Sequence, residues 1–167
     1  MFKIKAIPHK ELTCEILDEI IWVKSSVWPY PSDEQKKWIK NNIKDDDIHF
    51  LLYNASKAVA YLNLIDIEIE VDNQKEKAFG IGNVCAIEKG KGYGKELMKQ
   101  VNQFIIKSEK TGLLFCKNNL TPFYQKYGWK LINKNLLVLS LDIQNIETMA
   151  LIKTDNISSL KYKGNAF

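Results

Sequence analysis

The most informative stretch of this chain reads Lys89-Gly90-Lys91-Gly92-Tyr93-Gly94-Lys95 and lies between an apolar segment and an amphipathic one. Three glycines at alternate positions leave the backbone open, so consecutive N–H groups can converge on an anion. The amphipathic segment is expected to form a helix, whose N-terminal end adds a positive dipole, and three lysines add charge. The stretch therefore predicts a binding site for a phosphate group.

Two common nucleotide-binding motifs do not fit this loop. A Walker A motif needs a glycine five residues before Gly94, where Lys89 stands, and a hydroxyl residue where Glu96 stands. The dinucleotide-binding motif G-x-G-x-x-G fails because the glycines are Gly90, Gly92 and Gly94. A plain glycine turn with solvated lysines remains the alternative for the loop taken alone.

Composition limits the class of ligand. The chain has 167 residues, 46% of them hydrophobic, and a net charge of +4 in which all 24 basic residues are lysine. This modest excess suits an anionic ligand, and it falls short of what a dedicated nucleic-acid binder carries. Without arginine, phosphate binding must rely on backbone amides and lysine charge. We expect no nucleic-acid partner.

The cysteines and the apolar segments indicate the compartment. Cys14, Cys85 and Cys116 form an odd set without paired spacing, as expected for free thiols in a reducing environment. No segment approaches the ~20 apolar residues of a membrane span, and the N-terminus lacks the apolar core of a signal peptide. We therefore expect a cytoplasmic protein with no membrane partner. With only His9 and His49 and no Cys/His cluster, we also expect no metal.

Hydrophobic periodicity predicts alternating strands and helices without an internal repeat or linker, so we expect a single domain over residues 1–167. Ser32 is expected to cap the second helix. The predicted strands cover residues 2–6, 49–53, 58–71, 78–87 and 113–116, with a last pair over 130–132 and 136–141. The predicted helices cover residues 11–27, 32–42, the segment after the glycine loop, and 122–127.

Two motifs together resemble one family. The segment from Lys89 to Gly94 resembles the R/Q-x-x-G-x-G/A acetyl-CoA loop of the GNAT superfamily of N-acetyltransferases, with lysine replacing the usual Arg or Gln. Downstream, Pro122-Phe123-Tyr124-Gln125-Lys126-Tyr127-Gly128-Trp129 resembles the F-Y-x-K-x-G-F/W segment of that superfamily. Residues 113–129 look most similar to the branch that contains aminoglycoside 2'-acetyltransferase-like enzymes.

The resemblance implies a fold and a cofactor site. The fold is α+β in α/β/α layers, with a mixed, mostly antiparallel central sheet and a splayed parallel strand pair. Acetyl-CoA is the implied cosubstrate, and its pantetheine arm would pair like an added strand with Val84, Cys85 and Ala86. Asn118 or Asn119 would bond the pantetheine, although this asparagine stands later than in the family pattern; for Asn119, the favoured residue, the alternative is an ordinary turn role. The implied pyrophosphate site consists of Lys89, Gly90, Lys91, Gly92, Tyr93, Gly94 and Lys95.

The same resemblance implies one catalytic residue and leaves another open. Tyr124 would protonate the departing CoA thiolate as a general acid; the alternative is that it only packs against the cofactor. Many relatives carry a carboxylate base in the strand that enters the loop, but residues 78–87 contain none. The candidates for the base are Asp66, Glu68, His49 and a water relayed through Asn83.

Two further segments have open interpretations. Gly80 and Gly82 weaken a strand interior, which indicates either a bulge that makes room for the thioester and amine, or tight packing against a large residue such as Trp22 or Trp28. Trp28-Pro29-Tyr30-Pro31 lies where the superfamily lines its acceptor side, so its aromatic residues favour a bulky or planar acceptor. Core packing is the equal alternative.

The predicted function is acetyl-CoA-dependent transfer of an acetyl group to a primary amine of a small molecule, or less favourably of a peptide, by direct attack in a ternary complex. The missing carboxylate suggests an alternative, a non-catalytic acyl-CoA-binding regulatory module on the same fold. We expect a monomer or a homodimer; the C-terminal tail from Gln144 could pair an edge strand with a neighbouring molecule.

Overall fold

The computed structural model describes residues 1–142, 144–153 and 156–167, which form two compact units. Residues 1–65 and 83–101 make up the first unit, and residues 66–82 and 102–167 the second. The strands are β1 (Phe2–Pro8), β2 (Ile48–Asn54), β3 (Lys57–Val71), β4 (Gln74–Ala86), β5 (Thr111–Lys117), β6 (Lys130–Leu131), β7 (Leu137–Leu139), β8 (Ile146–Leu151) and β9 (Leu160–Tyr162). The α-helices are α1 (Cys14–Ser25), α2 (Ser32–Asn42), α3 (Tyr93–Lys107) and α4 (Thr121–Gln125), and the 3-10 turns are η1 (His9–Glu11), η2 (Asn118–Leu120) and η3 (Lys134–Leu136).

The strands form a mixed sheet. Among the described residues, hydrogen-bonded neighbours follow the order β1-β2-β3-β4-β5-β8-β6, with β9 beside β3 and β7. The β4–β5 and β7–β9 pairs are parallel, whereas β1–β2, β2–β3, β5–β8, β6–β8 and β3–β9 are antiparallel. The predicted mixed, mostly antiparallel α+β fold is confirmed.

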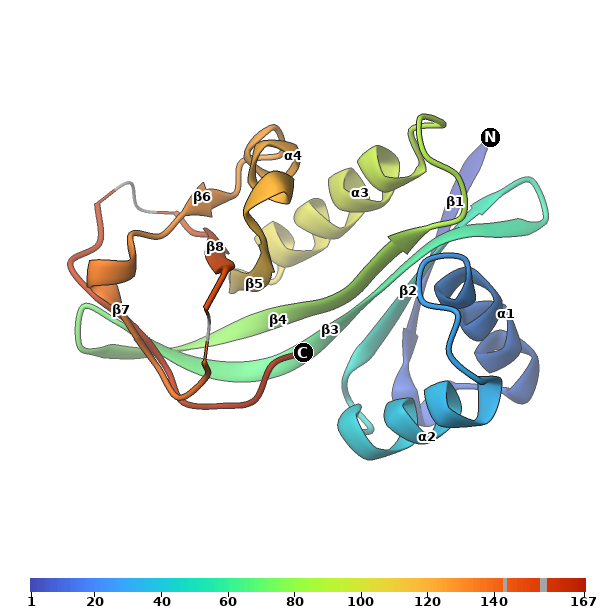
Figure 1. Cartoon of the computed structure of the whole chain (residues 1–167), viewed down its shortest axis with the longest axis horizontal. Helices are drawn as coiled ribbons and strands as arrows, with labels where there is room; N and C mark the ends of the chain where they lie inside the picture. Colours follow the sequence, from blue (N-terminus) through green and yellow to red (C-terminus); the bar gives the residue numbers. More distant parts are fainter. Residues whose placement is uncertain (143, 154–155) are drawn as a thin grey trace. The chain divides into compact units, whose positions relative to one another are not determined.

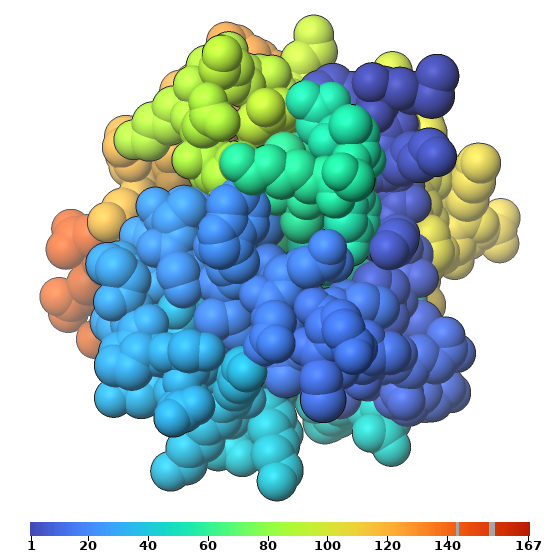
Figure 2. All heavy atoms as spheres, turned by 90° about the vertical axis from the view of Figure 1, so that its right-hand side faces the viewer, coloured from blue at the N-terminus to red at the C-terminus, as the bar shows by residue number. Residues whose placement is uncertain are grey.

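In the first unit, α1 and α2 pack over one face of β1 and β2 (Figure 1). The Thr13 side chain caps α1 by accepting a hydrogen bond from the Ile16 amide at 3.3 Å. The predicted cap of α2 was wrong, because Pro31 occupies the cap position and Ser32 is the first helical residue. Figure 2 shows α1 and α2 on this side of the molecule, with the teal β2–β3 turn and the yellow-green loop between β4 and α3 exposed above them.

In the second unit, the parallel ladder between β4 and β5 runs from the pair Ala78–Thr111 to the pair Ile81–Leu114. The predicted last strand pair was wrong, since β6 pairs with β8 and β7 pairs with β9. The tail, whose residues 154 and 155 lie outside the described part, supplies β8 and β9 to the chain's own sheet. The pairing partner of a short β-strand with few apolar residues is set by contacts with residues distant in sequence. Local sequence patterns do not predict this partner.

The paired glycines of β4 lie against the C-terminal residue of the chain. A Cβ at Gly80 would meet the Phe167 ring at 2.3 Å, and a Cβ at Gly82 would meet the Phe167 carbonyl carbon at 2.5 Å. The alternative of tight packing against a large residue is therefore correct in kind, but the expected neighbours Trp22 and Trp28 were wrong. The Phe167 ring also stacks on Phe115, with 5.2 Å between centroids.

Candidate active site

The glycine loop between β4 and α3 is open and exposed. Gly90 and Gly92 have φ angles of +81° and +77°, in the left-handed region that favours glycine. A Cβ at either position would meet nothing within 4 Å. Glycine is therefore needed at these positions for the backbone conformation and not because a neighbour is too close. A left-handed backbone with open space around it is what an anion site lined by amides needs.

The N-terminus of α3 follows this loop directly. The helix starts at Tyr93, and its first intrahelical bond runs from the Glu96 amide to the Gly92 carbonyl at 3.0 Å. The amides of the first turn, including those of Gly94 and Lys95, have no partner within an α-helix and are available to a ligand. Tyr93 is anchored by an edge-to-face contact with Phe2, at 6.0 Å between centroids.

The backbone of β4 changes direction immediately before the predicted pantetheine segment. Asn83 has a φ angle of +55°, a conformation that asparagine tolerates and that is typical of a β-bulge. Its side-chain amide donates to the Asn63 Oδ1 at 2.7 Å, which fixes the turn. The left-handed position in β4 therefore lies at Asn83, next to Val84, Cys85 and Ala86, and not at Gly80 or Gly82.

Cys85 is a buried free thiol, and burial raises its pKa to about 12. The thiol therefore stays protonated at neutral pH and is a poor nucleophile. Val84 and Ala86, on either side of it, are half-buried. This alternation is that of a strand with one face on the core.

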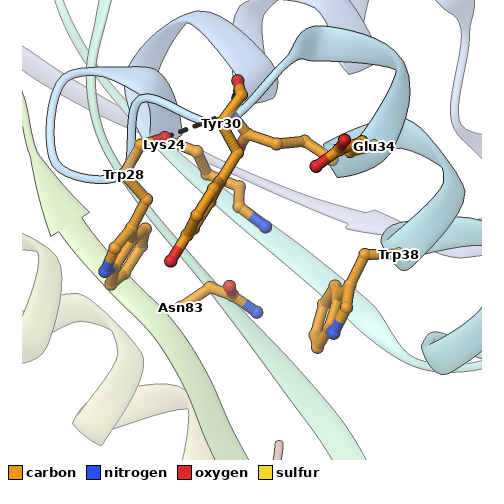
Figure 3. Close-up of a pocket in the computed structure, with 7 residues that line it drawn as sticks. Lys24, Trp28, Tyr30, Glu34, Trp38 and Asn83 are labelled. Carbon is orange, nitrogen blue, oxygen red and sulfur yellow. Dashed lines mark hydrogen bonds between the residues drawn. The ribbon is translucent and has the colours of Figure 1, made fainter.

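An aromatic pocket of about 440 Å³ lies beside Asn83, within the range of small-molecule sites. Trp28 and Tyr30 lie on one side of the Lys24 amine and the Asn83 amide, and Trp38 lies on the other (Figure 3). Trp28 also packs against the core, whereas Tyr30 is 62% exposed. The aromatic segment thus lines a cavity in addition to filling the core. The pocket is lined by Lys24, Trp28, Tyr30, Glu34, Gln35, Trp38 and Asn83.

Gln35 holds the pocket wall in place. Its Nε2 donates to the backbone oxygens of Trp28 and Tyr30, at 3.2 and 3.0 Å, and to the Ser25 hydroxyl at 3.0 Å. These acceptors identify the donor end of the amide, so the other end is the oxygen. A buried glutamine therefore ties the α1–α2 loop to the start of α2.

The structure places the candidates for the base in different environments. Asp66 and Glu68 are half-exposed and pair with lysines, Asp66 with Lys110 and Glu68 with Lys75. Neither carboxylate lines the aromatic pocket, but Asn83 does.

His49 is fully buried, and burial lowers its pKa to about 4. Both of its ring nitrogens are within hydrogen-bond distance of a neighbour, Nε2 at 2.9 Å from His9 Nδ1 and Nδ1 at 2.8 Å from the Tyr61 hydroxyl. The imidazole is therefore neutral at pH 7 and already partnered.

In the second unit, Tyr124 lies on α4 and is 6% exposed. Its ring makes edge-to-face contacts with Phe123 and Trp129, at 5.1 and 6.4 Å between centroids. Burial raises the pKa of its phenol, with a smaller contribution from Cys116, so Tyr124 keeps its proton well above neutral pH. Asn119, by contrast, lies exposed in the turn η2.

Four pocket residues were not singled out from the sequence: Lys24, Glu34, Gln35 and Trp38. Lys24 and Gln35 each stand four residues from a buried isoleucine, Ile20 and Ile39, so both fall on the buried stripe of an amphipathic helix. A polar residue on such a stripe is the signal that would have found them. Trp38 differs, because an aromatic residue on a helix is indistinguishable from core in a single sequence.

The described residues contain neither a candidate membrane span nor a candidate metal site. No helix in this part of the chain is long and apolar enough to cross a membrane. No group of three or more His, Cys, Asp or Glu side chains within it has the arrangement of a metal site.

Comparisons with solved structures show the same fold. ElaA of Escherichia coli is 20% identical, with 90% of this chain and 99% of that chain covered and a TM-score of 0.64. An acyl-CoA N-acyltransferase of Pseudomonas aeruginosa is 19% identical, with the same coverage and a TM-score of 0.65. An acetyltransferase of Streptococcus agalactiae is 14% identical, with 89% and 96% covered and a TM-score of 0.61.

Sequence comparison identifies the family. No curated protein matches the chain at a significant level. Residues 9–132 match the model of the acetyltransferase (GNAT) domain. This match covers most of the chain and includes both the glycine loop and the Phe123–Trp129 segment. The chain therefore belongs to the GNAT acetyltransferase domain family.

Proposed function

We propose that the protein is an acetyl-CoA-dependent N-acetyltransferase that acts on a primary amine of a small molecule by direct attack in a ternary complex. The observation that carries this proposal is the open loop with left-handed Gly90 and Gly92 directly before the free amides of α3. An exposed helix N-terminus with an open glycine backbone is suited to a pyrophosphate.

Acetyl-CoA would lie along one continuous segment of the first unit. Its pyrophosphate would accept hydrogen bonds from amides between Lys89 and Lys95, and its pantetheine arm would pair with the backbone of Val84–Ala86. The left-handed turn at Asn83 supports this assignment, because a kinked strand presents backbone groups that no neighbouring strand uses.

The acceptor amine would enter through the aromatic pocket, which Asn83 lines next to the pantetheine segment. The amine nitrogen forms a bond to the thioester carbon, the carbon–sulfur bond breaks, and CoA leaves as a thiolate. The amine proton would pass to a water held by Asn83. We favour this route over Asp66, Glu68 and His49, since those three side chains are engaged elsewhere.

Tyr124 would give its proton to the thiolate. The phenol is protonated at neutral pH, which a general acid requires, while burial raises its pKa and makes it a weaker acid. Replacing Tyr124 with Phe should lower kcat by about 10²–10⁴-fold with little change in acetyl-CoA affinity. Tyr127→Phe, which alters a half-buried neighbour in the same segment, is the matched control and should keep kcat within about twofold of the parent.

An acetylation screen read by free thiol release tests the activity itself. Its panel should include amino acids, polyamines, peptides and aminoglycosides, the last of which tests the resemblance to the aminoglycoside 2'-acetyltransferase-like branch. Calorimetry with acetyl-CoA, combined with this screen, distinguishes the acetyltransferase from the non-catalytic acyl-CoA-binding module. Tight binding without turnover on any amine would favour a non-catalytic acyl-CoA-binding module, which the absence of a carboxylate in residues 78–87 also suggests.

A further inference from the structure

The aromatic pocket contains a buried ammonium group without a counter-ion. Lys24 is 5% exposed, and its Nζ lies 4.8 Å from the centroid of the Trp38 ring. Its Nζ makes no hydrogen bond or ion pair with any residue in the described ranges. Burial lowers the pKa of this amine, because a buried charge without a partner is costly, and an anionic ligand beside it would offset that cost.

The groups around Lys24 do not supply this charge. Cys85, on β4, keeps its proton because burial raises its pKa to about 12. His49, on β2, is neutral because burial lowers its pKa to about 4. Glu34, on α2, lines the pocket but is exposed at its rim. The buried end of the pocket is therefore positive when Lys24 is protonated.

A second unpartnered atom lies in the same pocket. Gln35 is 4% exposed, and its Oε1 has no hydrogen-bond partner among the described residues, whereas its Nε2 has three. This oxygen is almost inaccessible to solvent, so a ligand N–H group would reach it only after a shift of the side chain. The pocket thus presents a cation at Lys24 between the planar walls of Trp28, Tyr30 and Trp38 (Figure 3), with an unsatisfied acceptor in its wall.

We propose that the acceptor is a small amine that also carries a carboxylate and a planar hydrophobic group, as an aromatic amino acid does. The carboxylate binds Lys24, the amine lies near Gln35 and Asn83, and the ring lies among the aromatic walls. The acetylation of the amine rests on the proposed function, whereas the binding of the carboxylate and the ring does not. A polyamine or aminoglycoside lacks the carboxylate and brings positive charge toward Lys24, so it is disfavoured.

Binding to the intact protein tests the anion site without any turnover. Calorimetry should compare 3-phenylpropionate, which has the ring and carboxylate, with phenethylamine, which has the ring and an amine, and with propionate, which lacks the ring. We expect 3-phenylpropionate to bind at least tenfold more tightly than either of the other two. Equal or tighter binding of phenethylamine would overturn the proposal.

Substitution of Lys24 tests whether its amine causes the preference for 3-phenylpropionate over phenethylamine. Lys24→Met keeps the length of the side chain and removes the charge, so the preference for 3-phenylpropionate should disappear. Lys24→Arg should retain it. Lys40→Met, on an exposed position of α2 outside the pocket, is the matched control and should change nothing. A preference that survives in Lys24→Met, with thermal unfolding as in the parent, would refute the role of Lys24.

Kinetics then distinguish this proposal from the proposed function. With acetyl-CoA, phenylalanine should have a KM at least tenfold below that of phenethylamine, and Lys24→Met should remove the difference. Turnover of phenethylamine in preference to phenylalanine would sink the acceptor assignment and leave the acetyltransferase intact. Selective binding of 3-phenylpropionate without turnover of any amine would support the anion site and count against the enzyme.

Discussion

Two Gly-x-Gly pairs of the chain, Gly80 with Gly82 and Gly90 with Gly92, use glycine for opposite reasons. Gly90 and Gly92 have left-handed backbones and open space around them. Gly80 and Gly82 are not left-handed, but Phe167 lies where their side chains would be. The first pair is glycine because of the backbone conformation, and the second because of the neighbour that covers it.

The difference shows that glycine spacing by itself does not identify a ligand site. An open left-handed pair leaves its amides to a ligand, whereas a covered pair is part of the core of the second unit. Substitution should therefore affect stability most in the covered pair and acetyl-CoA affinity most in the open pair. Four variants test this contrast.

Gly82→Ala should have the largest effect. Its Cβ would lie 2.5 Å from the Phe167 carbonyl carbon and 2.7 Å from the carbonyl oxygen, so backbone must move. We expect the free energy of unfolding in urea to fall by about 3 kcal/mol, the upper part of the range for overpacking. A loss below about 0.5 kcal/mol would show that Phe167 does not hold this position.

Gly80→Ala should cost less, about 1–2 kcal/mol, because the atoms that it meets belong to the Phe167 ring. A double-mutant cycle with Phe167→Ala measures the contact directly. In the Phe167→Ala background the cost of Gly80→Ala should nearly vanish. Additive effects of the two changes would contradict the proposed contact.

Gly92→Ala should lower acetyl-CoA affinity about tenfold, which corresponds to about 1.4 kcal/mol. The added Cβ meets no atom, but it disfavours the left-handed backbone by about 1–2 kcal/mol and so displaces the amides. Gly92→Asn, which tolerates this conformation, should keep most of the affinity. The contrast between the two pairs fails if Gly80→Ala weakens acetyl-CoA binding more than Gly92→Ala does.

Lys91→Gln should have the smallest effect, a two- to fivefold loss of acetyl-CoA affinity at low salt. Lys91 is exposed, so its charge contributes about 0.3–1 kcal/mol and is screened by ions. The loss should disappear at about 1 M salt, where the Debye length is about 3 Å. Lys37→Gln, on the exposed surface of α2, is the control and should not change affinity at any salt concentration.

The local sequence pattern was sufficient to predict elements whose conformation depends on one continuous segment of the chain. The start of α2 at Ser32, the strand over residues 57–71 and the loop before α3 follow from periodicity, proline and glycine. The partners of the short strands β6 and β7 were missed, because their pairing depends on β8 and β9, many residues downstream. A bulge or tight packing was expected at Gly80 and Gly82, and Phe167 packs there. The left-handed residue of β4 is Asn83, whose side chain is fixed by Asn63 from another strand.

The sequence by itself determined the family, the mixed α+β fold and the position of the glycine loop before α3. These depend on residues close together in the chain, whose spacing sets backbone conformation directly. The tertiary structure decided that Lys24, Gln35, Trp38 and Asn83 line one pocket, and that Phe167 covers Gly80 and Gly82. The physical reason is that a pocket is made by side chains from separate elements, and their burial and missing partners exist only once those elements pack together.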